Sequence, residues 1–121
     1  MDFNKLTLKS QEAIGQAQEL ARRAGNPEVY PEHLLLALLD EELPQQLVSS
    51  ASALRAEAET RLRAKPATQG AQQQPTVSRS FAEVLDLASE EARSMEDEYV
   101  STEHLLLALD VVPRDELLAK L

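Results

Sequence analysis

Apolar residues recur at helical spacing over two long stretches of the chain. In the first stretch they lie three or four positions apart, at Ile14, Ala17, Ala21 and Ala24. The second stretch repeats this spacing with larger side chains, at Phe81, Leu85, Ala88, Ala92 and Met95. Such a period is typical of a helix that buries one face. The pattern therefore predicts two long amphipathic helices, one in each half of the chain.

The run EHLLLAL follows each stretch, at residues 32–38 and again at residues 103–109. The same offset of 71 positions aligns the upstream residues without a gap, and places Leu-Thr at 6–7 on Val-Ser at 77–78. Self-similarity at a fixed offset indicates a duplicated structural unit. We therefore predict two equivalent helical halves that pack with their apolar faces together.

Helix start and stop signals divide each half into two helices. Thr7 and Ser78 precede the two apolar stretches and have the hydroxyl group that suits an N-cap. Gly25 suits the left-handed position that closes the first helix. The second helix is expected to begin near Pro31 in the first half and after Ser101 in the second half.

Further helices are expected at 44–51, 52–64 and 113–121. The second half has nothing that corresponds to 52–64, so we expect it to lack a last helix. Between the halves, KPATQGAQQQPT contains no large apolar residue and predicts a flexible connector. The predicted fold is one all-α domain over residues 1–121, with repeat one at 1–64, a linker at 65–76 and repeat two at 77–121.

Composition and charge restrict the kinds of partner. The chain is 43% apolar but only 3% aromatic, so its core is expected to consist of Leu, Ala, Ile and Val. Its formal net charge of −9 argues against nucleic acid or an anionic membrane as a partner, because both attract clustered Lys and Arg. The basic residues between Arg55 and Lys65 alternate with glutamates, which is typical of a solvated helix face.

The N-terminus lacks a basic start followed by an apolar run, so it does not resemble a signal peptide. The longest strongly apolar run, 34–39, is far shorter than the roughly 20 residues that cross a membrane. We therefore expect a soluble, cytoplasmic protein.

The usual motifs of catalysis and cofactor binding are missing from the sequence. The 3 glycines are too widely spaced to form a glycine-rich phosphate loop, and the absence of cysteine excludes a thiolate metal site. His33 and His104 supply too few ligands for a metal ion and are interpreted as packing or capping residues. No nucleophile or oxyanion feature accompanies the acidic residues. A small acidic helical enzyme is therefore disfavoured, and we expect no cofactor in this chain.

Glu32 and Glu103 head the repeated run, and their spacing leaves two interpretations open. A carboxylate in the first turn stabilises a helix by about 0.3–1 kcal/mol through the helix dipole, which needs no ligand. Alternatively, the two carboxylates and the hydroxyls of Thr7 and Ser78 frame two equivalent sites for a cationic group, since carboxylates form charge-assisted hydrogen bonds with guanidinium or ammonium groups. Acidic clusters elsewhere would attract basic segments of unfolded proteins.

The segment LTLKSQEAIGQAQELARRAGNPEVYPEHLLLALL and its echo VSRSFAEVLDLASEEARSMEDEYVSTEHLLLAL resemble the Clp N-terminal repeat domain. That domain precedes the ATPase modules of AAA+ chaperones such as ClpB, ClpA and ClpC. The resemblance covers nearly the whole chain, and FNKLTLKSQEAI and DEYVSTEHLLLAL look most like ClpB. It implies an all-α domain that engages unfolded or aggregated protein and is mobile on a hexamer, with ATP bound only by modules outside this chain. It also implies that the isolated domain is a monomer.

The resemblance also implies site residues. In ClpB-like domains, the matching substrate-contact positions are Thr7, Asp97 and Glu103. In ClpC-like domains, Glu32 and Glu103, together with Thr7 and Ser78, match positions that receive phosphorylated arginine. The alternative to a ClpB-like substrate-recruiting domain is therefore a ClpC- or ClpA-like module that docks adaptors or phosphoarginine, or a stand-alone Clp-repeat protein. Two departures from the family pattern are a short segment after Leu39 and a missing closing helix.

Overall fold

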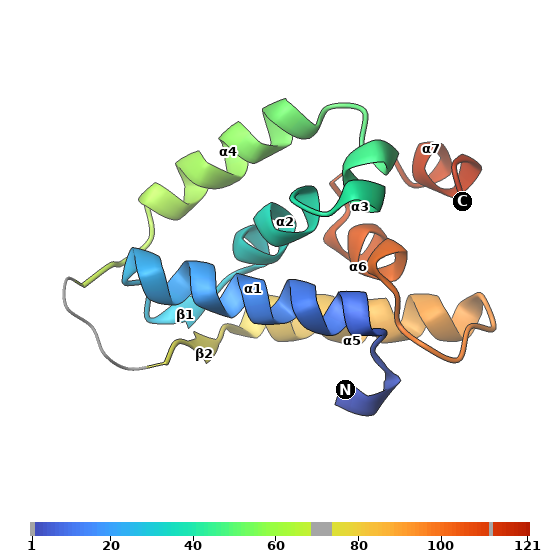
Figure 1. The fold of residues 1–121 in the computed structure, drawn as a ribbon, viewed down its shortest axis with the longest axis horizontal. Coiled ribbons are helices and arrows are strands. Elements are labelled where there is room, and N and C mark those ends of the chain that lie inside the picture. The colour runs from blue at the N-terminus through green and yellow to red at the C-terminus, as the bar shows by residue number, and fades with distance from the viewer. Residues whose placement is uncertain (1, 69–73, 112) are drawn as a thin grey trace.

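Each half of the chain folds into a pair of helices that pack against one another (Figure 1). The structure is a computed structural model that describes residues 2–68, 74–111 and 113–121. In it, helix α1 packs on α2 and helix α5 packs on α6. These helices span Leu8–Ala24, Pro31–Leu39, Arg79–Ser94 and Thr102–Leu109, in that order. The predicted all-α fold is confirmed.

The helix ends follow the predicted capping signals. The Thr7 hydroxyl accepts a hydrogen bond of 3.1 Å from the Ser10 N–H at the start of α1. The Ser78 hydroxyl accepts one of 3.1 Å from the Phe81 N–H at the start of α5. Gly25 closes α1 with a φ of 74°, in the left-handed region. Two residues that were predicted to lie on the buried faces of these helices, Ala24 and Met95, are exposed instead. Both lie where their helices end.

Shorter helices extend each pair. A 3-10 helix, η1 (Phe3–Lys5), precedes α1, and α3 (Glu42–Leu47), α4 (Ala51–Arg63) and α7 (Arg114–Ala119) follow the pairs. Helix α3 was predicted to begin at Pro44 but begins at Glu42. Pro44 therefore lies in the first turn, where proline is tolerated. Helix α4 packs on α2. Within the described residues, repeat two has no counterpart of α4.

A short parallel ladder joins the two halves, and the hydrophobic pattern did not predict it. Strand β1 (Glu28–Val29) pairs with β2 (Thr76–Val77), and an isolated parallel bridge joins Leu6 to Val100. Each pairing brings the residues before the first helix of one repeat to the residues before the second helix of the other. Two-residue strands are too short to show an alternating pattern, so periodicity cannot detect them.

Two backbone hydrogen bonds in these pairings are equivalent under the repeat. The Thr7 N–H donates to the Val100 carbonyl at 3.0 Å, and the Ser78 N–H donates to the Val29 carbonyl at 3.1 Å. The repeat offset maps Thr7 onto Ser78 and Val29 onto Val100. The halves are therefore interlocked, because each supplies a segment that the other needs to complete its backbone hydrogen bonds.

Parts of the predicted linker, residues 65–76, are held against repeat one. The Thr68 N–H donates to the Gly25 carbonyl at 2.9 Å, and the Asn26 side chain donates to the Pro66 carbonyl at 2.9 Å. Thr76 belongs to β2. The prediction of a connector without any element therefore differs from the structure at Thr76, and residues 69–73 lie outside the described residues.

The repeated run forms the centre of the core. Leu34, Leu38, Leu105 and Leu106 are fully buried, whereas Leu36 and Leu109 of the same run are only partly buried. The side chain of Phe81 is also fully buried. No helix in the described part of the chain combines the length and the apolar character that a membrane crossing requires.

The two histidines of the run are also buried, and each closes the turn before its helix. His33 Nδ1 accepts a hydrogen bond of 2.9 Å from the Tyr30 N–H, and His104 Nδ1 accepts one of 2.8 Å from the Ser101 N–H. The sequence interpretation of these residues as capping residues is confirmed.

Candidate binding grooves at the starts of helices α2 and α6

Thr7 and Glu103, which are 96 positions apart in the sequence, line one groove of about 480 Å³. Thr7 precedes α1, and Glu103 is the second residue of α6. Helix α3 and its N-cap form the remaining wall. The lining residues of this Glu103 groove are Thr7, Lys9, Glu41, Glu42, Pro44, Gln46, Ser101, Thr102 and Glu103.

The interlocked backbone brings Thr7 close to the start of α6, since its N–H binds the carbonyl of Val100. The Thr7 hydroxyl is largely committed to its own helix, because it accepts from the Ser10 N–H and donates to the Ser10 hydroxyl at 3.0 Å. One lone pair of its oxygen is left for a ligand. Glu103 Oε1 accepts a hydrogen bond of 3.2 Å from the Thr102 hydroxyl, and its other carboxylate oxygen has no such bond within the described residues.

The Glu103 groove is acidic with one cationic side chain among its lining residues. Glu41, Glu42 and Glu103 supply carboxylates, and Lys9 supplies an ammonium group. Lys9 Nζ lies 3.9 Å from Glu41 Oε2, and 70% of the Lys9 side chain is exposed. A contact this long with a largely exposed lysine is worth little, so the groove can exchange it for contacts with a ligand.

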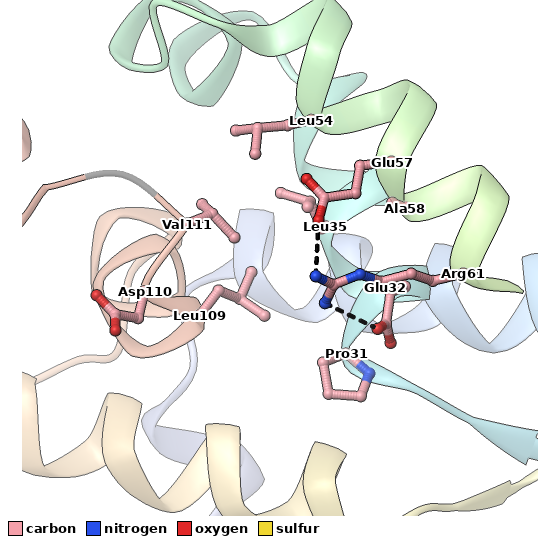
Figure 2. A pocket seen from close by; sticks show the side chains of 10 residues that line it. All are labelled: Pro31, Glu32, Leu35, Leu54, Glu57, Ala58, Arg61, Leu109, Asp110 and Val111. Atoms are coloured by element: carbon pink, nitrogen blue, oxygen red, sulfur yellow. Dashed lines mark hydrogen bonds and ion pairs between the residues drawn. The ribbon is translucent and has the colours of Figure 1, made fainter.

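Glu32 lies in a second, smaller cavity of about 290 Å³, which we call the Glu32 pocket (Figure 2). Helix α2, helix α4, the last residue of α6 and the segment that follows it form its walls. The lining residues are Pro31, Glu32, Leu35, Leu54, Glu57, Ala58, Arg61, Leu109, Asp110 and Val111. The Arg61 guanidinium extends from α4 between two carboxylates: its Nη1 lies 3.9 Å from Glu32 Oε2, and its Nη2 lies 2.6 Å from Glu57 Oε1.

Electrostatics around Glu32 also involve its neighbour in the sequence. Burial lowers the pKa of His33 from its usual value, and the Glu32 carboxylate opposes this shift. Because His33 Nδ1 accepts from the Tyr30 N–H, the neutral ring carries its proton on Nε2, which lies 3.0 Å from Asn26 Oδ1. His33 is therefore a neutral structural residue beside the charged Glu32.

The structure separates the five residues that the sequence predicts as substrate contacts. Thr7 and Glu103 share a groove, whereas Glu32 lies in the other pocket. Ser78 is only 4% exposed, caps α5 and is not among the residues that line either cavity. Asp97 Oδ2 binds His104 Nε2 at 2.8 Å. A contact of Ser78 or Asp97 with substrate remains a prediction.

Sequence reasoning missed Arg61, Glu57 and the acidic residues of α3 as parts of these cavities. It interpreted Arg61 as part of a solvated helix face. A usable signal was present, because Arg61 lies three residues after Ala58 and seven after Leu54, which places all three on one side of a helix. The acidic start of α3 gave no such signal, since its position depends on tertiary packing. In the described part of the chain, no group of three or more His, Cys, Asp or Glu is arranged to hold a metal ion.

Comparison with known proteins finds a family model and chaperones that are similar to this chain. The model of the "Clp repeat (R) N-terminal domain" matches residues 5–116. Chaperone protein ClpB of Mycobacterium leprae is 39% identical over 115 residues, covering 90% of this chain and 14% of that protein. Chaperone protein ClpB of Corynebacterium diphtheriae is 40% identical over 114 residues, covering 88% of this chain and 13% of that protein. The chain therefore spans about a seventh of the length of these relatives.

Solved structures show the same fold. The Hsp104 N-terminal domain of Candida albicans has a TM-score of 0.82 at 21% identity, covering 96% of this chain and 88% of that chain. The N-terminal domain of the caseinolytic protease associated chaperone ClpD of Arabidopsis thaliana has a TM-score of 0.71 at 25% identity, covering 99% of this chain and 86% of that chain.

Proposed function

This chain belongs to the family of Clp repeat N-terminal domains, and from that premise we propose that it recruits unfolded or aggregated protein substrates to a ClpB-like, ATP-dependent chaperone. It is a chaperone N-terminal domain, and the ATP-binding modules are expected outside it. The observation that carries the proposal is the Glu103 groove, where the interlocked halves bring Thr7 and Glu103 together.

The chemistry of this groove supports contact with exposed polypeptide. Unfolded chains expose backbone N–H groups and basic side chains, and the carboxylates of Glu103, Glu41 and Glu42 accept hydrogen bonds from both. The net charge of −9 attracts basic segments at longer range. We expect each contact to be weak and screened by salt, because the groove is open to solvent.

A hexamer of the full-length protein would convert weak contacts into useful affinity. Several tethered domains that bind one substrate raise its effective concentration without any new contact. The hexamer remains a prediction of the family resemblance, and the cytoplasmic location remains a prediction from the sequence.

The first prediction concerns Glu103. We expect the Glu103→Gln variant to bind a reduced and alkylated, permanently unfolded protein several-fold more weakly than the natural chain, because an amide cannot replace the charge of the carboxylate. Fluorescence anisotropy of the labelled unfolded protein measures this. Thr7→Ala is expected to act in the same direction, and Thr7→Ser is expected to restore binding.

Glu59→Gln is the matched control, since it makes the same change of charge at an exposed position of α4 that lines neither cavity. Equal binding by Glu103→Gln and Glu59→Gln, at unchanged unfolding midpoints, would contradict the assignment of the Glu103 groove.

A second candidate function is the docking of phosphoarginine or of an adaptor that presents a similar group. The favouring observation is that Lys9 and Glu103 line the same groove, so that an ammonium group is available for a phosphate and a carboxylate for a guanidinium. Isothermal titration calorimetry with free phosphoarginine distinguishes the two functions. Heat that Glu103→Gln abolishes would favour this candidate, and an absence of heat at millimolar ligand would exclude it.

A further inference from the structure

A further cavity, which we call the Arg63 pocket, lies between helices α1, α2 and α4 (Figure 1). Each of these helices contributes one partly buried leucine to its lining: Leu20 from α1, Leu36 from α2 and Leu62 from α4. Arg63, the last residue of α4, and Lys65, the first residue of the linker, also line it. Its volume of about 370 Å³ falls in the range of small-ligand pockets, roughly 300–1,000 Å³. The pocket can therefore hold an apolar side chain together with a polar group.

The two charged residues that line the Arg63 pocket are both cations. Among the described residues, no aspartate or glutamate lines it. The Glu103 groove and the Glu32 pocket, by contrast, are each lined by three carboxylates. The end of α4 adds a partial negative charge of about half an elementary charge, which two full positive charges outweigh. In a chain with a formal net charge of −9, this pocket is therefore a local site of positive charge.

Neither cation is neutralised by a carboxylate within the described residues. The Arg63 guanidinium donates from Nη2 to the hydroxyl of Thr60 at 3.0 Å, and Lys65 Nζ lies 4.7 Å from the centroid of the Tyr30 ring. The other two arginines of α4 are both paired with carboxylates. Arg63 and Lys65 are therefore available to bind an anion.

The remaining polar side chains of the lining are satisfied within the protein. His33 Nε2 lies 3.0 Å from Asn26 Oδ1, and the Asn26 amide donates to the Pro66 carbonyl at 2.9 Å. His33 and Asn26 are both buried. Recognition of a charged ligand therefore falls to Arg63 and Lys65.

Repeat two has no equivalent of this positive site within the described residues. The repeat offset places Glu91 at the position of Leu20, so a carboxylate replaces an apolar side chain. The cavity there is smaller, about 230 Å³, and both Glu91 and Arg114 line it. Its arginine is bound to Glu91 through two N–O distances of 2.6 Å. The unpaired positive charge is thus a property of repeat one and not of the duplicated fold.

Three leucines beside two cations suit a ligand that has an apolar side chain and a carboxylate close together. A guanidinium can bind a carboxylate through two parallel hydrogen bonds. The C-terminal residue of a polypeptide presents its side chain and its carboxylate on one Cα atom. An internal Asp or Glu next to an apolar residue does not, because adjacent side chains of an extended segment point to opposite sides. The pocket therefore favours a free C-terminus over an internal acidic residue.

We propose that the Arg63 pocket binds the free C-terminal carboxylate of a polypeptide that ends in a branched apolar residue such as leucine. Arg63 and Lys65 bind the carboxylate, and the three leucines contact the side chain. This inference rests on the proposed function for the source of such chain ends, since unfolded substrates leave their termini accessible. It adds a second site of opposite charge preference, because the Glu103 groove accepts basic segments.

The test uses three peptides with the same apolar ending. The first is acetyl-Ser-Ala-Ala-Leu with a free carboxylate, and the second is its C-terminal amide. The third is acetyl-Ser-Ala-Glu-Leu-amide, which restores the negative charge on an internal residue. Each is titrated into the isotopically labelled chain and followed by the amide NMR signals. We expect the free acid to shift the signals of Leu20, Leu36 and Leu62, and the other two peptides to bind several-fold more weakly.

Substitution of the cations should weaken binding of the free acid alone. Arg63→Gln and Lys65→Gln are each expected to reduce its affinity by about two- to five-fold, as for exposed ion pairs, and to leave binding of the amide unchanged. Arg61→Gln is the matched control, since it removes the same charge from the same helix at a residue outside the Arg63 pocket. The side chain of Arg63 is exposed, so equal urea midpoints of Arg63→Gln and Arg61→Gln are expected.

Equal binding of the free acid and the amide would overturn the inference, and so would equal binding of the free acid and the peptide with an internal Glu. An Arg63→Gln variant that binds the free acid as tightly as Arg61→Gln would also overturn it. If any of these occurs while Glu103→Gln still weakens binding of an unfolded protein, the proposed function stands without this second site. If unfolded protein fails to bind at all and the free acid still binds in an Arg63-dependent manner, the proposed function fails and the pocket remains a site for a chain end.

Discussion

His33 and His104 make the same capping hydrogen bond but contact different partners with their second ring nitrogen. His33 Nε2 faces the neutral amide of Asn26, whereas His104 Nε2 faces the carboxylate of Asp97. Asn26 and Asp97 occupy equivalent repeat positions, and so do the N-cap residues Tyr30 and Ser101, so the two caps differ at both positions. Asp97 is therefore a structural partner of α6 in this molecule, whatever else it contacts.

The buried cap at His33 makes stability depend on pH. Because burial lowers its pKa in the folded state, the unfolded chain takes up the proton first as the pH falls below about 6.5. Its contribution to stability is thus complete above that value and declines as the pH falls toward the folded pKa. We expect the urea midpoint to be lower at pH 5.5 than at pH 7.5.

His33→Gln should be less stable than the natural chain at pH 7.5, with a smaller change of midpoint between the two pH values. Carboxylates titrate mainly below this range. An unchanged pH dependence in His33→Gln would show that another group is responsible.

At the scale of elements, the end of α1 depends on Gly25. Its φ of 74° disfavours any side chain, and a Cβ there would collide with the carbonyl oxygen of Thr68. We expect Gly25→Ala to lower the free energy of unfolding by more than about 1 kcal/mol. Gly15→Ala is the control on the same helix, where a Cβ meets nothing within 4 Å, and it should stabilise by up to about 1 kcal/mol. Urea unfolding of both variants measures this, and equal effects would contradict the capping role.

Helix α7 is joined to α5 by an ion pair between Arg114 and Glu91, with two N–O distances of 2.6 Å. The Arg114 guanidinium holds the pKa of Glu91 below its usual value. The pair is therefore intact above the unfolded pKa, about 4.5, and is lost as the pH falls through the lower folded value.

We expect Arg114→Gln to speed hydrogen exchange of the α7 amides at pH 7, with little change in α1 and α2. The difference between this variant and the natural chain should shrink as the pH falls toward the folded pKa of Glu91. Exchange rates in α7 that are equal at pH 7 would show that apolar contacts, such as those of the buried Leu117, hold this helix.

The sequence predicted elements well where periodicity and caps agreed, as at Thr7, Ser78 and Gly25. It failed where position depends on contacts between distant segments. The pairing of Leu6 with Val100 has no local signal, and neither does the approach of Arg61 to Glu32. For the same reason the sequence predicted two equivalent sites at the glutamates but did not show that the two cavities have different linings.

At the scale of the whole molecule, the interlocked backbone predicts that neither half folds alone. We expect the fragments 1–70 and 71–121 to show little helix separately, since each leaves the segments before its helices without backbone partners. An equimolar mixture should regain helical signal in circular dichroism at 222 nm. A fragment that is fully helical as a monomer would contradict this. The control is the uncut chain at the same concentration, which should show the full helical signal.

The crossed hydrogen bonds of Thr7 with Val100 and of Ser78 with Val29 also bear on how such a domain can originate. A polypeptide with only one copy of the repeat could satisfy both bonds by pairing with an identical molecule, because the two bonds are related by the repeat. The result would be a twofold-symmetric homodimer. Fusing the two copies makes the partner permanently available at high effective concentration. It also frees each copy from symmetry, so that one could acquire Arg61 beside its glutamate while the other kept an open groove.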